Sequence, residues 1–326
     1  MQKVKMGRRR KGRPVSGWVN LDKQLHMSSA QAVNRLRRVF NAQKAGHAGT
    51  LDPLATGILP VALGEATKTV PYLVDAEKEY EFTVRWGIAT STDDVEGEVV
   101  AENDGRPDEN EITRALAQFI GVIDQIPPAY SAVKVAGKRA YARARAGETL
   151  ALAARPVRIK RLDLLACPDK DHAAFSVTCG KGTYIRSLAR DLALALGTCG
   201  HVSALRRVRV GPFSEKNALT LVKCMDLVHI AAQTEGTIAE HRADAAFDAL
   251  DGLLLPLTTA LDDIPALPIN DAEAAHVKMG RSIGVISMAD SAGPDGYEAV
   301  VMLAERPVAI GHVTQGRFQP TRVFNL

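Results

Sequence analysis

The sequence predicts an α+β protein, with a mixed, largely antiparallel sheet flanked by helices and a small β-rich domain at the C-terminal end. Three observations support this fold class. Strand and helix patterns follow each other without the regular spacing of βαβ units, amphipathic helices lie between the strands, and strand and turn signals dominate after about residue 265. We therefore expect a disordered basic tail over 1–14, a large domain over 15–250 and a small domain over 255–326.

The first part of the large domain shows strand and helix signals in turn. A short strand is predicted over 17–23, and the helix that follows begins at Ser28 or Ser29, either of which can cap it. A later helical start should break near Pro71. Residues 79–87, EYEFTVRWG, alternate as a half-buried strand does.

The rest of the large domain shows the same two patterns. Amphipathic helices are predicted over 110–121 and 182–197, and Gly197 ends the second. Strands are predicted over 156–167, 173–180 and 201–211. The first two of these strands follow each other closely, and we expect them to pair.

Charge is distributed unevenly along the chain. The formal net charge is +4, but three Lys/Arg stand against thirteen Asp/Glu between residues 225 and 300, which leaves an excess of about +14 elsewhere. A basic body is typical of a protein that binds a polyanion, because its cations neutralise phosphates. A single basic cluster is as often a solvated surface, but several clusters in one chain favour nucleic acid.

One basic segment, 126–148, is predicted to form a strand, a turn and a basic helix. It carries Lys134, Lys138, Arg139, Arg143, Arg145, Tyr130 and Tyr141. Such interleaving suits RNA, since cations neutralise phosphates while aromatic rings stack on bases. On this stretch alone, a packed helix with a solvated basic side is an equally good interpretation.

Several classes of site and location lack support in the sequence. The cysteines are Cys167, Cys179, Cys199 and Cys224. They form no CxxC pair, so we expect a reducing, cytoplasmic setting and no disulfide framework. The basic start precedes no apolar segment, and no stretch approaches the length of a membrane span. No HExxH, zinc-type spacing, GxGxxG or GxxxxGK[ST] motif is present, so neither a metal nor a cofactor is expected.

The stretch GHAGTLDPLATGILP, which begins at Gly46, is predicted to form a shaped loop. Asp52 precedes a proline, which restricts its backbone to extended conformations and gives its short side chain a defined direction. Nearby glycines, including Gly49 and Gly57, let a substrate approach the backbone closely. Taken alone, however, Asp52 is more often a turn-forming or capping residue, and His47 a loop histidine bonded to the backbone.

The loop and its surroundings resemble a known family. Residues 46–68, GHAGTLDPLATGILPVALGEATK, closely resemble the signature loop of the bacterial tRNA pseudouridine-55 synthases, the TruB family. The resemblance continues in KEYEFTVRWGIATSTDDVEGEV (78–99), IPPAYSAVKVAGKRAYARARAG (126–147), ARPVRI (154–159), CGKGTYIRSLARDLALALG (179–197) and HVSALRRVRVGPF (201–213). It covers most of residues 17–225 in order. This long, specific signal favours a catalytic interpretation of Asp52 over the turn interpretation.

The resemblance implies roles for four central residues. Asp52 matches the catalytic aspartate, which attacks or assists at the ribose of the target uridine. Tyr80 matches the tyrosine that stacks on the flipped base. Tyr184 and Arg186 match a second active-site tyrosine and the arginine that pairs with the catalytic aspartate.

Three further residues are implied as substrate-binding. Leu205 matches the apolar residue beneath the base, His47 the loop histidine that helps to hold the flipped-out target, and Lys23 a lysine near the site. One departure lies beside Lys23. Family members usually read DKPxGxxS where this chain reads DKQLHMSS, so Gln24 and His26 replace a proline and a glycine. This puts in doubt the shape of that loop and the role of Lys23.

The family resemblance also implies the architecture and the partner. The expected architecture is the pseudouridine synthase fold over 15–250, with an RNA-contacting insertion at about 124–152 and a PUA-like domain over 255–326. The expected partner is the T-arm stem-loop of tRNA, and the expected protein is a monomer without metal or membrane contact. The target uridine lies inside the folded T-loop, so it must be flipped outward before a catalytic group can reach it.

The implied reaction breaks the N1–C1′ bond of uridine, rotates the uracil and rejoins it through C5. No redox change occurs and no group is added, so no cofactor is needed. A carboxylate such as Asp52 can form a covalent ester at C1′ or steady positive charge there, or it can take the 2′ proton in a glycal route. The base that removes the C5 proton is also open, with Tyr80, Tyr184 or a bound water as candidates.

Two other functions fit the same fold. One is a non-catalytic RNA-binding or RNA-folding protein, which would tolerate the loss of Asp52 or Arg186, yet both are present. The other is a pseudouridine synthase that acts on a different RNA, whose active site would look alike. A hydrolase built on Asp52 and His47 fits poorly, because no nucleophile, base and orienting residue occur together.

Overall fold

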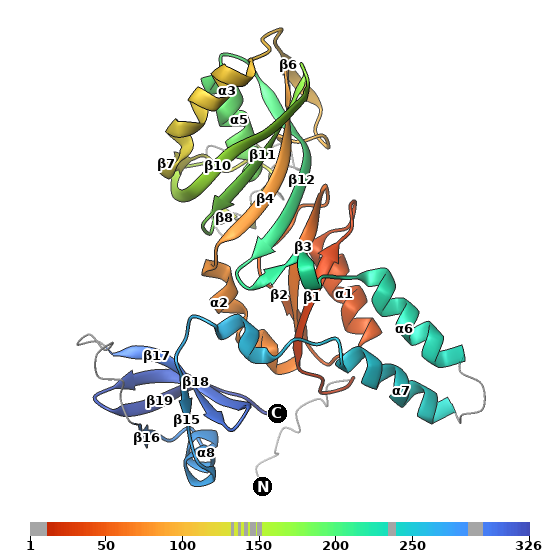
Figure 1. The fold of residues 1–326 in the computed structure, drawn as a ribbon, viewed down its shortest axis with the longest axis vertical. Coiled ribbons are helices and arrows are strands. Elements are labelled where there is room, and N and C mark those ends of the chain that lie inside the picture. The colour runs from red at the N-terminus through yellow and green to blue at the C-terminus, as the bar shows by residue number, and fades with distance from the viewer. Residues whose placement is uncertain are drawn as a thin grey trace.

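The computed structural model describes residues 12–131, 134–135, 138–139, 143, 148, 152–233, 239–285 and 296–326 (Figure 1). Residues 1–11 of the expected tail and most of the predicted basic helix within 126–148 lie outside the described residues. The tail was expected to be disordered up to residue 14, but Arg13 forms a two-point ion pair with Asp251, at 2.6 and 3.2 Å. This pair ties the start of the described chain to helix α7 (Ala239–Asp251).

A ten-stranded sheet forms the body of the large domain (Figure 1). Its main path runs β14 (Leu219–Thr220), β1 (Gly17–Lys23), β3 (Ala55–Leu63), β12 (Gly200–Val210), β4 (Lys78–Trp86), β11 (His172–Cys179), β10 (Arg155–Asp169) and β7 (Gly121–Gln125). At its sides, β2 (Ala45–His47) pairs with β3 and β13 (Phe213–Ser214) with β12. Only β1–β14 and β3–β12 are parallel among the described pairs of this sheet, which confirms a mixed, largely antiparallel sheet.

Helices cover both ends of this sheet (Figure 1). α3 (Glu109–Leu116) and α5 (Ile185–Ala195) pack at the β10–β4 end, and α1 (Ser29–Val39) and α6 (Leu221–Gln233) pack near β1 and β3. Ser28 caps α1 in a capping box with Gln31. One apolar cluster contains Leu36 of α1, Phe82 of β4 and Leu188 of α5, so the two helical ends share a continuous core.

The remaining elements of the chain before the C-terminal sheet are short. Two small strand pairs are β5 (Ile88–Thr90) with β6 (Val99–Glu102), and β8 (Lys134–Val135) with β9 (Lys138–Arg139). Single 3₁₀ turns are η1 (Gly64–Lys68), η2 (Ala117–Phe119), η3 (Glu215–Asn217) and η4 (Leu257–Leu261). The strands β8 and β9 are the described elements of the expected insertion at 124–152.

The helical start that was predicted to break near Pro71 does break there, and a second helix follows. η1 is followed by α2 (Val70–Asp75), and Pro71 lies in the first turn of α2. Proline is well tolerated in a first turn, because the N–H that it lacks would have no partner within the helix. The predicted break is confirmed, but the prediction missed the second helix that follows it.

The C-terminal segment forms a second, five-stranded sheet. Its order is β15 (Ala266–Pro268), β17 (Tyr297–Leu303), β18 (Arg306–Thr314), β19 (Arg317–Val323) and β16 (Ile283–Gly284), with α8 (Asp271–Lys278) beside it. The predicted β-rich C-terminal domain is thus present. Phe324 joins Trp18 and Phe213 of the large sheet in one apolar cluster, and Lys68 Nζ donates to Val323 O at 2.7 Å. The small domain therefore packs against the large one through a shared apolar core.

Candidate active site

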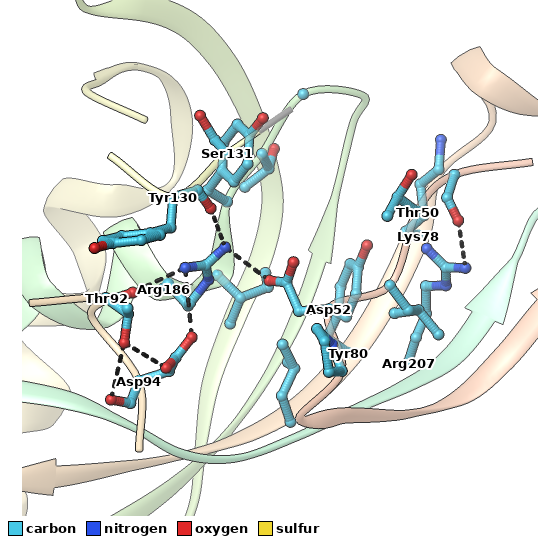
Figure 2. A pocket seen from close by; sticks show the side chains of 18 of the residues that line it. Thr50, Asp52, Lys78, Tyr80, Thr92, Asp94, Tyr130, Ser131, Arg186 and Arg207 are labelled. Atoms are coloured by element: carbon cyan, nitrogen blue, oxygen red, sulfur yellow. Dashed lines mark hydrogen bonds and ion pairs between the residues drawn. The ribbon is translucent and has the colours of Figure 1, made fainter. Parts of the chain in front are cut away.

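Five of the seven predicted site residues line one cavity of about 910 Å³. They are Asp52, Tyr80, Tyr184, Arg186 and Leu205. The cavity lies where the loop before β3, strands β4 and β12, and the start of α5 meet. Figure 2 shows Arg186 between Asp52 and Asp94, with Tyr80 and Arg207 on the other side of Asp52.

The backbone on both sides of Asp52 is held by the β1–α1 region. Ser29 Oγ accepts a hydrogen bond from Leu51 N at 2.8 Å and donates one to Leu51 O at 2.9 Å. On the other side, His26 N donates to Pro53 O at 2.9 Å. Because both neighbours of Asp52 are fixed, its carboxylate is aimed into the cavity, where 37% of the side chain stays exposed.

Arg186 connects Asp52 to the opposite wall (Figure 2). Its guanidinium lies 2.9 Å from the Asp52 carboxylate and 3.4 Å from the Asp94 carboxylate. It also donates to Thr92 O at 2.8 Å and to Tyr130 O at 2.9 Å. Only 4% of the side chain is exposed, so this buried cation is compensated by two carboxylates and two carbonyls. The arrangement places the Asp52 carboxylate against a fixed cation, beside an open space.

Asp94 is a functional residue that the sequence reasoning missed. Its side chain is buried, and it accepts hydrogen bonds from Thr92 Oγ1 at 2.6 Å and from Glu96 N at 3.0 Å. These bonds fix the carboxylate against Arg186. In the sequence, Asp94 belongs to a polar turn, and a turn-forming aspartate is the ordinary interpretation of such a position.

Arg207 is the second missed residue, and it supports Tyr80. It is almost fully buried, and it donates to Ile58 O at 2.7 Å and to Gly49 O at 3.0 Å. Its guanidinium lies 6.0 Å from the centre of the Tyr80 ring. Burial raises the pKa of Tyr80, and Arg207 only partly opposes this. Tyr80 is therefore a neutral hydrogen-bonding ring near pH 7. In the sequence, LRRVRV reads as one more basic cluster.

Lys23 and His47 do not line the cavity. Lys23 is buried, and its ammonium donates to Met27 O at 2.8 Å and to Gln24 O at 3.0 Å, beneath the loop that carries Asp52. His47 ends β2, and its pKa is lowered by burial first and by Arg207 second. A direct substrate contact by either residue stays a prediction, and the structure gives Lys23 a supporting position.

Replacing Lys23 with Met tests its buried charge through the pH dependence of stability. Burial lowers the pKa of Lys23 from 10.5 to about 8 in the folded protein. Between these pH values the unfolded chain binds more protons than the folded one, so the free energy of unfolding rises with pH. We expect the wild-type value to rise relative to Lys23→Met by on the order of 3 kcal/mol across this window.

Urea denaturation at several pH values measures this difference. Lys78, whose pKa is also lowered to about 8, titrates in both proteins and so cancels. A difference that stays constant from pH 7 to 10.5 would contradict the lowered pKa of Lys23.

The departure at His26 preserves the backbone shape that a glycine allows. His26 has φ +58°, in the left-handed region that costs a residue with a side chain about 1–2 kcal/mol. We expect His26→Gly to raise the free energy of unfolding by about 0.5–1 kcal/mol, because relief of this strain exceeds the added entropy of the unfolded chain. Thermal unfolding measures the change. The matched control is Gln24→Gly, at a residue that has no positive φ. This change should not raise the free energy of unfolding. Equal gains at both positions would refute the strain argument.

Three further properties hold for the part of the chain that the structure describes. No group of three or more His, Cys, Asp or Glu side chains there is placed to hold a metal ion. Within the same ranges, no helix is long and apolar enough to cross a membrane. The four cysteines, all within these ranges, are free.

Comparison with known proteins identifies the family. Residues 37–185 match the family model described as TruB family pseudouridylate synthase (N terminal domain), and residues 186–262 match the tRNA pseudouridylate synthase B C-terminal domain. The chain belongs to the TruB family. It is 50% identical over 317 residues to tRNA pseudouridine synthase B of Agrobacterium fabrum, with 97% of each chain covered. It is 48% identical over 326 residues to the Caulobacter vibrioides protein of that name, covering 98% of this chain and 100% of that one.

Solved structures agree with this placement. Cbf5 in a Cbf5–Nop10–Gar1 complex matches with a TM-score of 0.70 and 28% identity over 95% of this chain and 84% of that one. An H/ACA RNP bound to a substrate RNA containing 2′-deoxyuridine gives a TM-score of 0.70 at 24% identity, covering 100% of this chain and 93% of that one, which supports the fold alone. This TruB-family chain is thus a tRNA pseudouridine synthase, an isomerase that converts uridine to pseudouridine in tRNA.

Proposed function

We propose that this enzyme isomerises uridine 55 in the T-loop of tRNA, with Asp52 acting at C1′ of the flipped-out nucleotide. The observation that carries the proposal is the Asp52–Arg186 ion pair, which opens into a cavity lined by Tyr80 and Leu205. These four side chains fit a reaction that cleaves a glycosidic bond and keeps the base in place. They supply a carboxylate, a buried cation, an aromatic ring and an aliphatic surface.

The geometry suits base retention rather than hydrolysis. A hydrolase acting on a glycosidic bond uses a second carboxylate to activate water. Asp94, the carboxylate that shares Arg186 with Asp52, is buried and also engaged by Thr92, so it is not free to activate water. Tyr80 and Leu205 present one ring and one aliphatic surface, between which a uracil can be held while it turns. Released uracil would otherwise leave an abasic site.

Asp52 serves equally in either of two routes. It can form an ester with C1′, with uracil as the leaving group, or it can take the 2′ proton as uracil departs. In both, rejoining through C5 requires loss of the C5 proton. Burial raises the pKa of Tyr184, as it does that of Tyr80, so both hydroxyls are protonated at the start of the reaction.

Recognition of the T-arm is proposed to rest on shape and phosphate contacts. The insertion at 124–152 is proposed to grip the RNA, and exposed cations on the adjacent strand β10 extend that surface. They are Arg155, Arg158, Lys160 and Arg161. The C-terminal domain, proposed to be PUA-like over 255–326, lies at the far end of the molecule (Figure 1). We propose that the enzyme is cytoplasmic and monomeric.

The test is tritium release from T-arm stem-loops that carry 5-tritiated uridine, since C5 loses its hydrogen when the base rejoins through it. Wild-type enzyme should release one tritium per RNA from the native loop and none when uridine 55 is replaced by cytidine. A matched RNA in which another loop uridine is replaced by cytidine should still release the tritium of uridine 55. Release that ignores the change at 55 would refute the site specificity, and binding without release would favour a non-catalytic RNA-binding role.

A further inference from the structure

We propose that Arg190 is a positioning residue for the isomerisation and acts through Arg186. Arg190 lies one helical turn after Arg186 on α5, so both side chains emerge from the same face. Arg190 does not line the cavity. Its effect would come from holding the two backbone segments to which Arg186 donates.

The two arginines bridge the same pair of segments. Arg186 donates to Thr92 O and to Tyr130 O. Arg190 Nη1 lies 2.9 Å from the Asp93 carboxylate, and its Nη2 donates to Ile126 O at 3.0 Å. Each guanidinium therefore joins the turn at 92–94 to the run at 126–130. Because Arg190 is not in contact with Asp52, it clamps these segments without touching the reacting groups.

The first of these segments has a strained backbone. Asp93 has φ +58°, a left-handed conformation that costs a residue with a side chain about 1–2 kcal/mol. Three contacts hold it there: the ion pair with Arg190, Asp93 N to Thr90 O at 3.2 Å, and Val202 N to Asp93 O at 3.0 Å. Thr92 and Asp94, on either side, both contact Arg186. Release of Asp93 would therefore move two of the four groups that orient Arg186.

The second segment is the base of the insertion that is proposed to grip the RNA. Ile126 O accepts from Ser187 Oγ at 2.8 Å as well as from Arg190, and the Gln125 side chain accepts from Tyr184 N at 2.7 Å. Four residues later, Tyr130 O accepts from the same Arg186 nitrogen that faces Asp52. The proposal rests here on the proposed function, because it makes the root of the RNA-binding segment part of the support of Arg186.

A loss of Arg190 should thus appear in the chemical step. Displacement of a catalytic group by about 1 Å can cost about a hundredfold in rate. Ser187 and Asp94 still restrain both segments in its absence, so we expect Arg190→Met to lower the single-turnover rate constant by about tenfold or more. The affinity for tRNA should change less than about threefold, since Arg190 is engaged within the protein and lies outside the cavity.

The experiment measures tritium release and filter binding with full-length tRNA transcripts that carry 5-tritiated uridine throughout. Arg106→Met is the matched control. Arg106 pairs with Asp171 at 2.5 Å and donates to Asn103 O at 2.9 Å, with a side-chain exposure of 30% against 25% for Arg190. It lies outside the cavity and should leave the rate constant unchanged. Because the whole tRNA is labelled, wild-type release reports the reaction even if uridine 55 is not its target.

A double variant separates positioning from general structural damage. If Arg190 acts through Arg186, adding Arg190→Met to Arg186→Lys should lower the rate by less than about threefold further. Asp93→Asn removes the partner charge while asparagine still tolerates the left-handed backbone, so it should reproduce the effect if Arg190→Met folds poorly. Multiplicative losses in the double variant, or an equal loss in Arg106→Met, would overturn the proposal.

Discussion

Asp52→Asn should lower tritium release by at least about 10⁴-fold under saturating single-turnover conditions. Asparagine keeps the shape and can still accept a hydrogen bond from Arg186. It carries no negative charge, so it can neither attack C1′ nor take a proton. Binding of tRNA, measured by filter retention, should stay within about threefold, because the carboxylate is one short group in a cavity of about 910 Å³.

Asp22→Asn is the matched control for this variant. Asp22 also pairs with an arginine, Arg206, at 2.9 Å, but it lies outside the cavity around Asp52. Asp22→Asn should keep the rate constant within about threefold of the wild-type value. Residual activity of Asp52→Asn near the wild-type level, at equal RNA binding, would remove Asp52 from the mechanism.

Arg186→Lys should lower the rate constant by about 10²–10³-fold, the second-largest effect expected. The four acceptors around the guanidinium lie in different directions, and the compact ammonium of lysine cannot reach all of them as a planar fork does. The Asp52 carboxylate would then lose its fixed partner while keeping a nearby positive charge. Single-turnover tritium release measures the rate, and filter binding should show little change because Arg186 is buried.

The control for Arg186 is Arg209→Lys. Arg209 pairs with Glu79 at 2.7 Å and donates to Gly211 O at 3.2 Å, outside the cavity. It should retain the wild-type rate constant. If Arg186→Lys instead lost RNA affinity in proportion to rate, Arg186 would be a substrate-binding residue rather than the partner of Asp52.

The central part of the site could be predicted from the sequence because its motifs are local. The loop around Asp52 and the run that holds Tyr184 and Arg186 each form a continuous, specific stretch, and family resemblance gave these residues their roles. Asp94, Arg190 and Arg207 could not be found in this way. Each looks like an ordinary turn or surface residue in its own segment, and its importance arises from contacts with segments distant in the sequence.

The fold was predictable to a similar extent. Strands with clear alternation, such as 79–87, were found with small boundary errors, and the sheet class was confirmed. The helices α6 and α7 were not predicted, because both are only weakly amphipathic. They are stabilised partly by packing against each other, and α6 also packs against α1. Burial of Lys23 beneath the Asp52 loop likewise depends on the tertiary arrangement of three carbonyl groups.

The most direct measurement is a structure of the protein bound to a T-arm stem-loop with 5-fluorouridine at position 55. Fluorine replaces the C5 hydrogen, so the last proton removal cannot occur and the nucleotide should stay in the site. We expect a flipped-out base between Tyr80 and Leu205, with the Asp52 carboxylate beside the ribose and still paired with Arg186. A base that remains stacked in the T-loop, or one that is bound away from Asp52, would contradict this expectation.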